Sequence, residues 1–462
     1  MEGFCHKEEE NGLSARNTVL DSLIKVLEEK KPLHLVLKEA LGKTESREDR
    51  KFVSRLTRGC VERALTLDGI INRYSSVKAA KQKTVIRNIL REGIYQILFM
   101  DSVTDFAACD ESVKLAGKRG FRSLTGFVNG VLRSICREKD SILKDIERAG
   151  LSYKYSVPEP VLNEFVKSFG KEESEEAFKY FFTDTGVSYR INRSKIDLAL
   201  LYKKLNDQPS DSEILFTKNR YLEECFNLKG AGTPDGMEEF KNGAVVVQDP
   251  SSVLVGYGAD SCFRSTELFG KKEKARVLDL CAAPGGKSMH MADMGYHVTS
   301  CDISEAKCQL IKEAAERCGF SDIDIRVNDA SIYNEDFKEA FDIVLCDLPC
   351  SGLGIIGKKP DIKYNVTEEK IKELAALQKK ILENAVKYVK TNGILVYSTC
   401  TLTALENTDN YDYLLKVLGL KKIPVKEHLP KGIVPDRPDD GYIVIRPGKY
   451  DSDGFFISCC SK

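Results

Sequence analysis

Hydrophobic residues in the N-terminal third of the chain recur at helical spacing. In residues 84–100 the apolar side chains lie three and four positions apart, and the same period returns in 121–135 after a break at Gly120. This pattern predicts an all-helical N-terminal domain over residues 1–142. The polar faces of its helices indicate one basic side, which carries Arg55, Arg58, Arg63, Arg87 and Arg91.

A different pattern begins near residue 241. Short β-rich runs alternate with helical stretches such as 305–318 and 368–389. Such alternation predicts a mostly parallel, doubly wound sheet, here in an α/β domain over residues 241–462. The expected strands are 244–248, 276–280, 297–302, 322–327, 341–346, 393–398, 442–445 and 455–459.

The residues between these two parts show a mixed pattern. Pro158 and Pro160 mark a turn before an amphipathic stretch at 161–169, and residues 188–192 have the composition of a strand. We therefore predict a small connecting α/β subdomain over residues 143–240.

The 462-residue chain has no net charge, because its 70 Lys and Arg residues balance its 70 Asp and Glu residues. This balance argues against a uniformly basic nucleic-acid-binding protein and against a membrane-surface protein. However, residues 1–150 hold 28 basic and 22 acidic residues, a net charge of +6, and the remainder carries −6. The asymmetry indicates an N-terminal module that faces a nucleic acid, although solvated helix surfaces would give the same count.

The 15 cysteines are dispersed and form no C-x-x-C pair, and the five histidines are scattered. We therefore expect no zinc or other metal site. The N-terminal residues do not resemble a signal peptide, and no apolar stretch reaches the roughly 18 residues of a membrane-spanning helix. We expect a cytoplasmic protein with reduced thiols and no contact with a membrane.

The segment after the expected strand 276–280 has the composition of a ligand-binding loop. Its small residues let the backbone approach a ligand closely, and the next helix offers free N–H groups. Asp302 ends the next strand, where a carboxylate can accept hydrogen bonds from ribose hydroxyls, and Asp329 follows the expected strand 322–327. The pattern predicts a nucleoside-bearing cofactor and leaves NAD and S-adenosylmethionine open. Helix capping is the structural alternative for both acids.

Two cysteines and one acid follow two of the expected strands of this part, 341–346 and 393–398. Asp347 and Cys350 come after 341–346, and Cys400 comes after 393–398. If these strands are neighbours, the three side chains converge at the carboxyl edge of the sheet. A thiolate that adds to carbon 6 of a pyrimidine activates carbon 5 toward a methyl group, and an acid can stabilise the charge on the ring. The alternative is that both cysteines are only buried side chains at strand ends.

Three motifs resemble those of the Nop2/Sun family of S-adenosylmethionine-dependent RNA cytosine-C5 methyltransferases. They are LCAAPGGK at 280–287, DLPCSG at 347–352 and STCT at 398–401, in the order of the family. The segments VQDPSS at 247–252 and DGFF at 453–456 resemble further parts of the same family. The N-terminal segments DRKFV at 49–53 and FVNGVLR at 127–133 resemble the NusB-type RNA-binding domain.

The resemblance implies a Rossmann-like class I methyltransferase domain that uses S-adenosylmethionine, joined to a NusB-like RNA-binding domain. Among such methyltransferases this fusion is typical of bacterial enzymes that act on small-subunit ribosomal RNA. The implied reaction is methylation of carbon 5 of one cytosine of 16S rRNA, cytosine 967. The implied substrate is naked RNA or an early assembly intermediate, because the base must be unstacked. We expect the enzyme to be a monomer.

The resemblance also implies roles for individual residues. Cys400 matches the nucleophile that adds to carbon 6, Cys350 matches the residue that helps release the product, and Asp347 matches the acid that contacts the cytosine. A solvated cation at a helix start is the alternative for Lys287. The positions that match cofactor contacts are Cys281, Ala282, Ala283, Pro284, Gly285, Gly286, Lys287, Asp302, Asp329 and Asp347.

Three features depart from the family pattern. Two Arg residues usually follow the Pro-Cys motif, whereas this chain has Lys358 and Lys359, which lack the planar fork with which Arg binds phosphate. Tyr364 stands where Trp is common, and the acidic run after the Thr-Cys motif is reduced to LENT at 405–408. None of these changes removes a catalytic group.

Three other functions stay open at this point. A DNA cytosine methyltransferase would use Cys350 rather than Cys400 as its nucleophile. A NusB-like RNA-binding or antitermination factor would carry an inactive methyltransferase fold, but Asp347 and both cysteines are present. The same chemistry on transfer RNA is the third alternative.

Overall fold

The computed structural model describes residues 2–207, 214–270, 274–437 and 439–462, with side chains from residue 13 onward. The chain forms two compact units. The first, called the helical unit below, comprises residues 1–163 and 358–366. The second, called the sheet unit, comprises residues 164–357 and 367–462.

The helical unit consists of packed helices, and its described residues contain no strand. This confirms the predicted all-helical N-terminal domain. The division between the two units falls within α10. The elements are α1 (Glu2–Leu23), η1 (Ile24–Glu28), α2 (Leu33–Gly42), α3 (Arg47–Glu62), α4 (Ala64–Tyr74), η2 (Ala79–Lys81), α5 (Thr84–Phe99), α6 (Asp105–Lys118), η3 (Arg122–Leu124), α7 (Thr125–Arg137), α8 (Lys139–Arg148), α9 (Leu151–Lys154), α10 (Glu159–Phe169) and η7 (Ile362–Tyr364).

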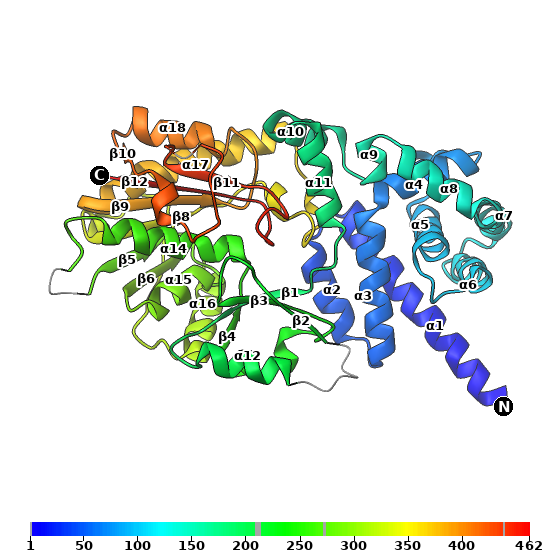
Figure 1. Ribbon diagram of the computed structural model, residues 1–462. Coiled ribbons are helices and arrows are strands. Elements are labelled where there is room, and N and C mark those ends of the chain that lie inside the picture. The colour runs from blue at the N-terminus through cyan, green and yellow to red at the C-terminus, as the bar shows by residue number, and fades with distance from the viewer. Residues whose placement is uncertain (1, 208–213, 271–273, 438) are drawn as a thin grey trace. The chain divides into compact units, whose positions relative to one another are not determined.

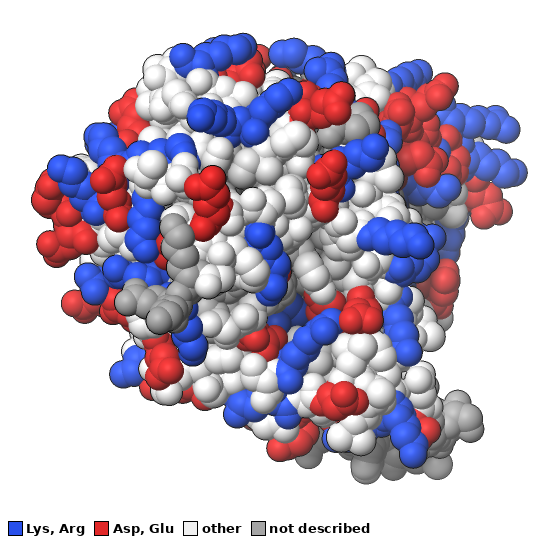
Figure 2. Space-filling model, turned by 60° about the vertical axis from the view of Figure 1, so that its left-hand side comes forward, with Lys and Arg blue, Asp and Glu red and all other residues white. Residues whose placement is uncertain are grey.

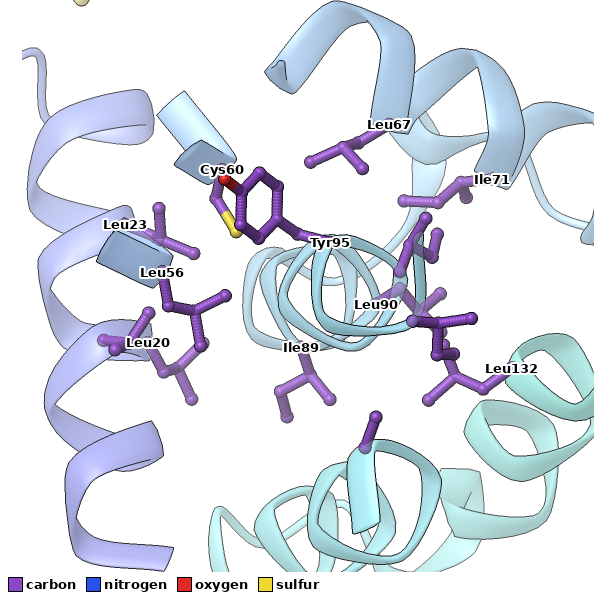
Figure 3. Close-up of a cluster of buried hydrophobic side chains, with 14 of the residues drawn as sticks. Leu20, Leu23, Leu56, Cys60, Leu67, Ile71, Ile89, Leu90, Tyr95 and Leu132 are labelled. Carbon is purple, nitrogen blue, oxygen red and sulfur yellow. The ribbon is translucent and has the colours of Figure 1, made fainter. Parts of the chain in front are cut away.

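The core of the helical unit forms around α5. Ile89, Leu90 and Tyr95 of this helix are buried among apolar side chains of the surrounding helices (Figure 3). Full burial of a leucine or isoleucine side chain contributes about 1.5–3 kcal/mol. Tyr95 also requires a glycine on α3, because a Cβ at Gly59 would lie 2.0 Å from the tyrosine ring.

Two of the five arginines expected on a basic face point inward instead. Arg91 donates to both carboxylate oxygens of Asp68 at 2.7 Å, and Arg87 donates to Glu28 at 2.6 Å. Side-chain exposure is only 8% for Arg91 and 13% for Arg87. The prediction of one basic face is wrong for this pair, because buried and solvated arginines can follow the same helical spacing.

The sheet unit contains a small antiparallel sheet with the strand order β2-β3-β1-β4. The expected strand at 188–192 is β1. The expected strand at 244–248 is β4, but it pairs with β1 and is no part of the doubly wound sheet, because hydrophobic alternation identifies a strand and not its partner. The elements of this region are α11 (Lys171–Phe181), β1 (Val187–Ile191), α12 (Leu198–Asn206), β2 (Leu215–Lys218), β3 (Cys225–Lys229), η4 (Pro234–Gly236), α13 (Glu238–Lys241) and β4 (Val245–Val247).

The large sheet has the strand order β10-β12-β9-β8-β5-β6-β7, and β11 pairs with β12. The strands from β9 to β7 are parallel, whereas β10, β11 and β12 pair antiparallel. This confirms the Rossmann-like, mostly parallel sheet. The strands are β5 (Arg276–Asp279), β6 (His297–Asp302), β7 (Asp324–Val327), β8 (Phe341–Asp347), β9 (Val389–Thr399), β10 (Lys421–Lys422), β11 (Tyr442–Ile445) and β12 (Phe455–Ser461).

Helices cover both faces of the large sheet, with α14, α15 and α16 on one face and α17 and α18 on the other (Figure 1). The inner strands are therefore buried on both sides, which explains their continuous hydrophobic runs. No helix in the described ranges is long and apolar enough to cross a membrane. The remaining elements are α14 (Pro250–Arg264), α15 (Gly286–Asp293), α16 (Glu305–Cys318), η5 (Glu335–Phe337), η6 (Leu353–Ile355), α17 (Glu368–Tyr388), α18 (Thr408–Lys416) and η8 (Val425–His428).

Candidate active site

Four neighbouring parallel strands end at one edge of the large sheet with Asp or Cys residues, of which Asp302, Asp347 and Cys400 were predicted site residues and Asp279 was not. β6 ends at Asp302, β5 at Asp279 and β8 at Asp347, while β9 ends directly before Cys400. Ligands of such sheets bind beyond the carboxyl ends of the strands. Because β8 and β9 are adjacent, the structure brings together Asp347, Cys350 and Cys400, as the sequence predicted.

The two cysteine side chains meet between the loops that follow β8 and β9. The Sγ atoms of Cys350 and Cys400 are 3.3 Å apart, which is within hydrogen-bond distance for sulfur. The N–H of Gly354 donates to the Cys400 carbonyl at 2.9 Å and so links the loops. A Cβ at Gly354 would lie 2.1 Å from the Gly454 carbonyl oxygen, so this close approach requires glycine.

The Cys350 thiol is held in its neutral form. Its hydrogen bond with Cys400 and its burial raise its pKa well above the usual value, and the charges of Glu406 and Asp347 act in the same direction. Cys350 is therefore an S–H donor at neutral pH. Such a donor can stabilise a thiolate on the neighbouring cysteine.

Asp347 is anchored on both carboxylate oxygens. Oδ2 lies 2.6 Å from Lys287 Nζ, and Oδ1 accepts a hydrogen bond from Ser398 Oγ at 2.8 Å. Lys287 also donates to Ser252 Oγ at 2.8 Å and is 8% exposed. Lys287 is therefore no solvated cation. It fixes a carboxylate whose side chain keeps 28% of its surface open.

A buried carboxylate that the sequence reading did not select links the two cysteine loops. Glu406 is fully buried and accepts a hydrogen bond from the Ser351 N–H at 2.8 Å. Ser351 directly follows the first cysteine, and its hydroxyl lies 2.6 Å from that of Thr401, which directly follows the second. The shortened acidic run at 405–408 marked this place in the sequence but did not give its contacts.

The strand β5 ends in a carboxylate that has one oxygen without a hydrogen-bond partner in the described part of the chain. Asp279 is fully buried, and its Oδ2 accepts a hydrogen bond from Ser288 Oγ at 2.7 Å. Its Oδ1 has no partner among the described residues, and burial raises its pKa to about 6. A buried acceptor of this kind fits a ligand that brings a hydrogen-bond donor.

Asp302 and Asp329 lie at strand ends and accept local hydrogen bonds. Asp302 accepts from the N–H of Ala283 in the cofactor loop at 3.0 Å, whereas the N-cap of the following helix is Ser304. Asp302 is therefore not a helix cap. Asp329 accepts from the N–H of Ser331 at 2.9 Å and closes a local turn.

These residues fit a nucleoside-bearing cofactor. Carboxylates at the ends of β5 and β6 are acceptors, whereas the hydroxyl and amino groups of S-adenosylmethionine are donors. Gly285 has a φ of +105°, which side chains rarely allow, and α15 begins at Gly286 with N–H groups that lack helical partners. We infer that residues 281–287, Asp302 and Asp329 would hold the cofactor.

Residues 358–366 belong to the helical unit although they follow the Pro-Cys motif. The Tyr364 hydroxyl lies 3.0 Å from Ser156 Oγ, and the Lys363 ammonium group donates to the Glu62 carbonyl at 2.7 Å. Tyr364 packs against the apolar core of that unit. The aromatic position that departs from the family pattern therefore has a packing role.

Two family models match the chain. The model of the 16S rRNA methyltransferases RsmB/F matches residues 267–460, and the model of the NusB family matches residues 13–137.

Curated relatives match nearly the whole chain. It is 34% identical over 460 residues to the probable ribosomal RNA small subunit methyltransferase B of Bacillus subtilis (strain 168), with 97% of this chain and 99% of the relative covered. It is 30% identical over 425 residues to the protein of the same name from Synechocystis sp., with 90% and 91% covered.

Solved structures share the fold. The crystal structure of PH0851 covers 98% of both chains with a TM-score of 0.76 and 22% identity. The structure of NSun6 from Pyrococcus horikoshii with SFG covers 66% of this chain and 98% of that chain, with a TM-score of 0.53 and 19% identity. At these identities the likeness concerns the fold alone.

Proposed function

The chain belongs to the ribosomal RNA small subunit methyltransferase B family, and from this premise we propose that it methylates carbon 5 of one cytosine in 16S rRNA. S-adenosylmethionine is the methyl donor of this family. The family resemblance implies cytosine 967 as the target. The observation that carries the proposal is the pair of thiols at Cys350 and Cys400, 3.3 Å apart at the carboxyl edge of the sheet.

Carbon 5 of cytosine is a poor nucleophile, and a thiolate can activate it. We assign this role to Cys400, whose sulfur forms a bond to carbon 6 and leaves carbon 5 as the nucleophilic carbon of an enamine. S-adenosylmethionine supplies an electrophilic methyl group when it is bound. A base then removes the proton from carbon 5, the electrons of that bond re-form the ring double bond, and the thiolate leaves carbon 6.

We assign Cys350 and Asp347 to the cytosine and to product release. A neutral Cys350 can donate a hydrogen bond to the departing Cys400 thiolate, which lowers the cost of breaking the sulfur–carbon bond. Asp347 is anchored by Lys287 and Ser398. An anchored carboxylate can stabilise charge that develops on the ring without first having to reorient.

Two cysteine variants test the mechanism with 16S rRNA transcripts and a labelled methyl group. Cys400→Ala should reduce methyl transfer by about 10³-fold or more, because the covalent route is lost. Cys350→Ala should instead accumulate a covalent protein–RNA adduct that survives denaturing electrophoresis. Cys136→Ala removes a partly exposed thiol of the helical unit and serves as the matched control with normal activity.

The same pair of variants separates the alternatives. Normal turnover by Cys400→Ala would contradict the mechanism. An adduct in Cys400→Ala and loss of transfer in Cys350→Ala would assign the nucleophile to the Pro-Cys motif, as in a DNA cytosine methyltransferase. Calorimetry without any S-adenosylmethionine binding would favour an RNA-binding factor with an inactive methyltransferase fold.

The RNA target is tested in cells. Bisulfite sequencing of total RNA from a deletion strain should show the loss of one protected cytosine in 16S rRNA and none in transfer RNA. We further propose that the protein acts as a monomer in the cytoplasm, on naked 16S rRNA or an early assembly intermediate, because the target base must be unstacked.

A further inference from the structure

We propose that Glu406 is a positioning residue of this site: its buried carboxylate ties the loop of Cys350 to the loop of Cys400 and thereby sets the position of the two thiols. The effect of Glu406 on methyl transfer rests on the proposed function. The contacts themselves do not depend on which substrate is bound.

The Glu406 carboxylate is fully buried and accepts four hydrogen bonds. Oε1 accepts from the Ser351 N–H at 2.8 Å and from Gln378 Nε2 at 3.2 Å. Oε2 accepts from Ser351 Oγ at 2.5 Å and from Thr403 Oγ1 at 2.8 Å. A carboxylate offers about four acceptor positions, so this one is saturated and has none left for a substrate. Its role is therefore to fix the protein groups around it rather than to bind a substrate.

The partners of this carboxylate lie next to both cysteines in the chain. Ser351 follows the first cysteine and is bound through its backbone and its hydroxyl. Gln378 also donates to the carbonyl of Pro349, directly before the same cysteine, at 2.8 Å. Thr401 follows the second cysteine and shares a hydrogen bond with Ser351 Oγ. One buried group thus fixes the loop on both sides of one thiol and reaches the other loop.

The negative charge of Glu406 also acts on Cys350. The titratable groups that face this thiol are Cys400, Glu406, Asp347 and Tyr397. The first three raise the pKa of Cys350, and burial together with Cys350 raises the pKa of the Tyr397 hydroxyl. Removal of the Glu406 charge should therefore let Cys350 ionise at lower pH. Loss of a carboxylate that does not face this thiol should leave this ionisation unchanged.

Glu406→Gln removes the charge and keeps the shape. The amide oxygen can take the two N–H donors of Oε1, and the amide nitrogen then faces two hydroxyls that can rotate to accept. Asp409→Asn is the matched control, because it removes one carboxylate at an exposed position in the first turn of α18.

Alkylation of Cys350 by iodoacetamide, followed by peptide mass spectrometry across a pH series, measures the thiol without any methylation. We expect iodoacetamide to alkylate Cys350 at least about 3-fold faster in Glu406→Gln than in the wild type at a given pH. The pH profile of this alkylation should move to lower pH. We also expect the kcat of Glu406→Gln for methylation to fall about 10-fold while the KM for S-adenosylmethionine changes little. Asp409→Asn should match the wild type in the alkylation profile, in kcat and in KM.

A wild-type alkylation profile in Glu406→Gln would overturn the proposal, whatever happens to methylation. Because alkylation needs no RNA, this failure is distinct from a failure of the proposed function, which Cys400→Ala tests.

Ser351→Ala provides a second route should Glu406→Gln not fold. It removes the hydroxyl contacts to Glu406 and Thr401 and leaves the backbone contact. Diamide oxidises two neighbouring thiols to a disulfide and is itself reduced to the hydrazine, so its reaction with Cys350 and Cys400 reports their proximity. We expect the disulfide between Cys350 and Cys400 to form at least about 3-fold more slowly in Ser351→Ala than in the wild type. An unchanged rate of disulfide formation would overturn the proposal.

Discussion

At the scale of single residues, the carboxylates of the site differ in whether their oxygens have partners. Asp347 is anchored by Lys287 and Glu406 is saturated, whereas Asp279 keeps one buried oxygen without a partner among the described residues. A buried acceptor without a donor costs stability, and a bound ligand can supply the donor. Asp279 is thus a buried acceptor that lowers stability unless a ligand supplies a donor.

The pH dependence of stability tests this view of Asp279. Its pKa is raised from 3.8 to about 6 in the folded protein. Between these values the folded state binds more protons than the unfolded state, so the contribution of Asp279 lowers stability as pH rises from about 4 to about 6. Asp279→Asn should reduce that fall by at most about 3 kcal/mol, since one pKa unit corresponds to about 1.4 kcal/mol.

Urea unfolding at several pH values measures the effect, with Asp409→Asn as the exposed control. The variant should also bind S-adenosylmethionine about 10-fold more weakly in calorimetry, because the amide has only one oxygen and cannot both accept from Ser288 and offer an acceptor to the ligand. An unchanged pH slope would show that the buried carboxylate carries no such penalty.

At the scale of elements, residues 358–366 connect the Cys350 loop to the helical unit. Asp361 accepts a hydrogen bond from the Leu33 N–H at 3.3 Å, and Lys363 donates to the Glu62 carbonyl. The chain then returns to the sheet unit at α17. The helical unit thus holds a segment that begins eight residues after Cys350.

Lys363 gives this segment a pH-dependent stability. Burial lowers its pKa from 10.5 to about 7, so between these values the unfolded chain binds more protons and stability rises with pH. Lys363→Met should flatten that rise, by at most about 5 kcal/mol. Unfolding followed between about pH 7 and 10 measures it, and Lys370→Met at an exposed site of α17 is the control. Equal slopes in both variants would contradict the assignment.

The elements themselves were largely readable from the sequence. The helix α16 and the strand β6 have the predicted bounds, because each has an uninterrupted period and clear breakers. The strand β4 was recognised but given the wrong sheet. We propose residues 143–240 as a connecting subdomain. The strand β4, which follows this range, pairs with β1 in the small sheet.

At the scale of the whole molecule, both signs of charge are mixed on the surface in view (Figure 2), and some cations of the N-terminal part turn inward. Figure 2 shows Lys and Arg side chains interspersed with Asp and Glu over the face in view. In the helical unit, Arg87 and Arg91 form partly buried ion pairs with Glu28 and Asp68. The exposed cations of residues 51–100 include Lys78, Lys81 and Lys83, which lie in the connection between α4 and α5.

These three lysines carry a prediction about RNA binding. Their combined replacement by Gln should weaken binding to all RNA sequences and reduce the slope of log K against log salt by about 2, because each phosphate contact contributes about 0.7–0.9. Filter binding at several salt concentrations measures the slope. The control replaces Lys416, Lys421 and Lys422, which are exposed in the sheet unit.

An unchanged slope would exclude the α4–α5 connection from the RNA contact. Deletion of residues 1–140 is a less clean test, because it would also remove Leu33 and Glu62, the partners of residues 358–366.

The sequence by itself determined the two architectures and singled out the segment 280–287 and the two cysteines, because periodicity and short motifs are local properties of the chain. Only the tertiary structure decided which strands are neighbours, and so whether Cys350 and Cys400 meet. It also decided that Lys287 pairs with Asp347, that two arginines turn inward and that Glu406 joins the two loops. These contacts join residues far apart in the chain, and burial and hydrogen bonding select them only when the fold is complete.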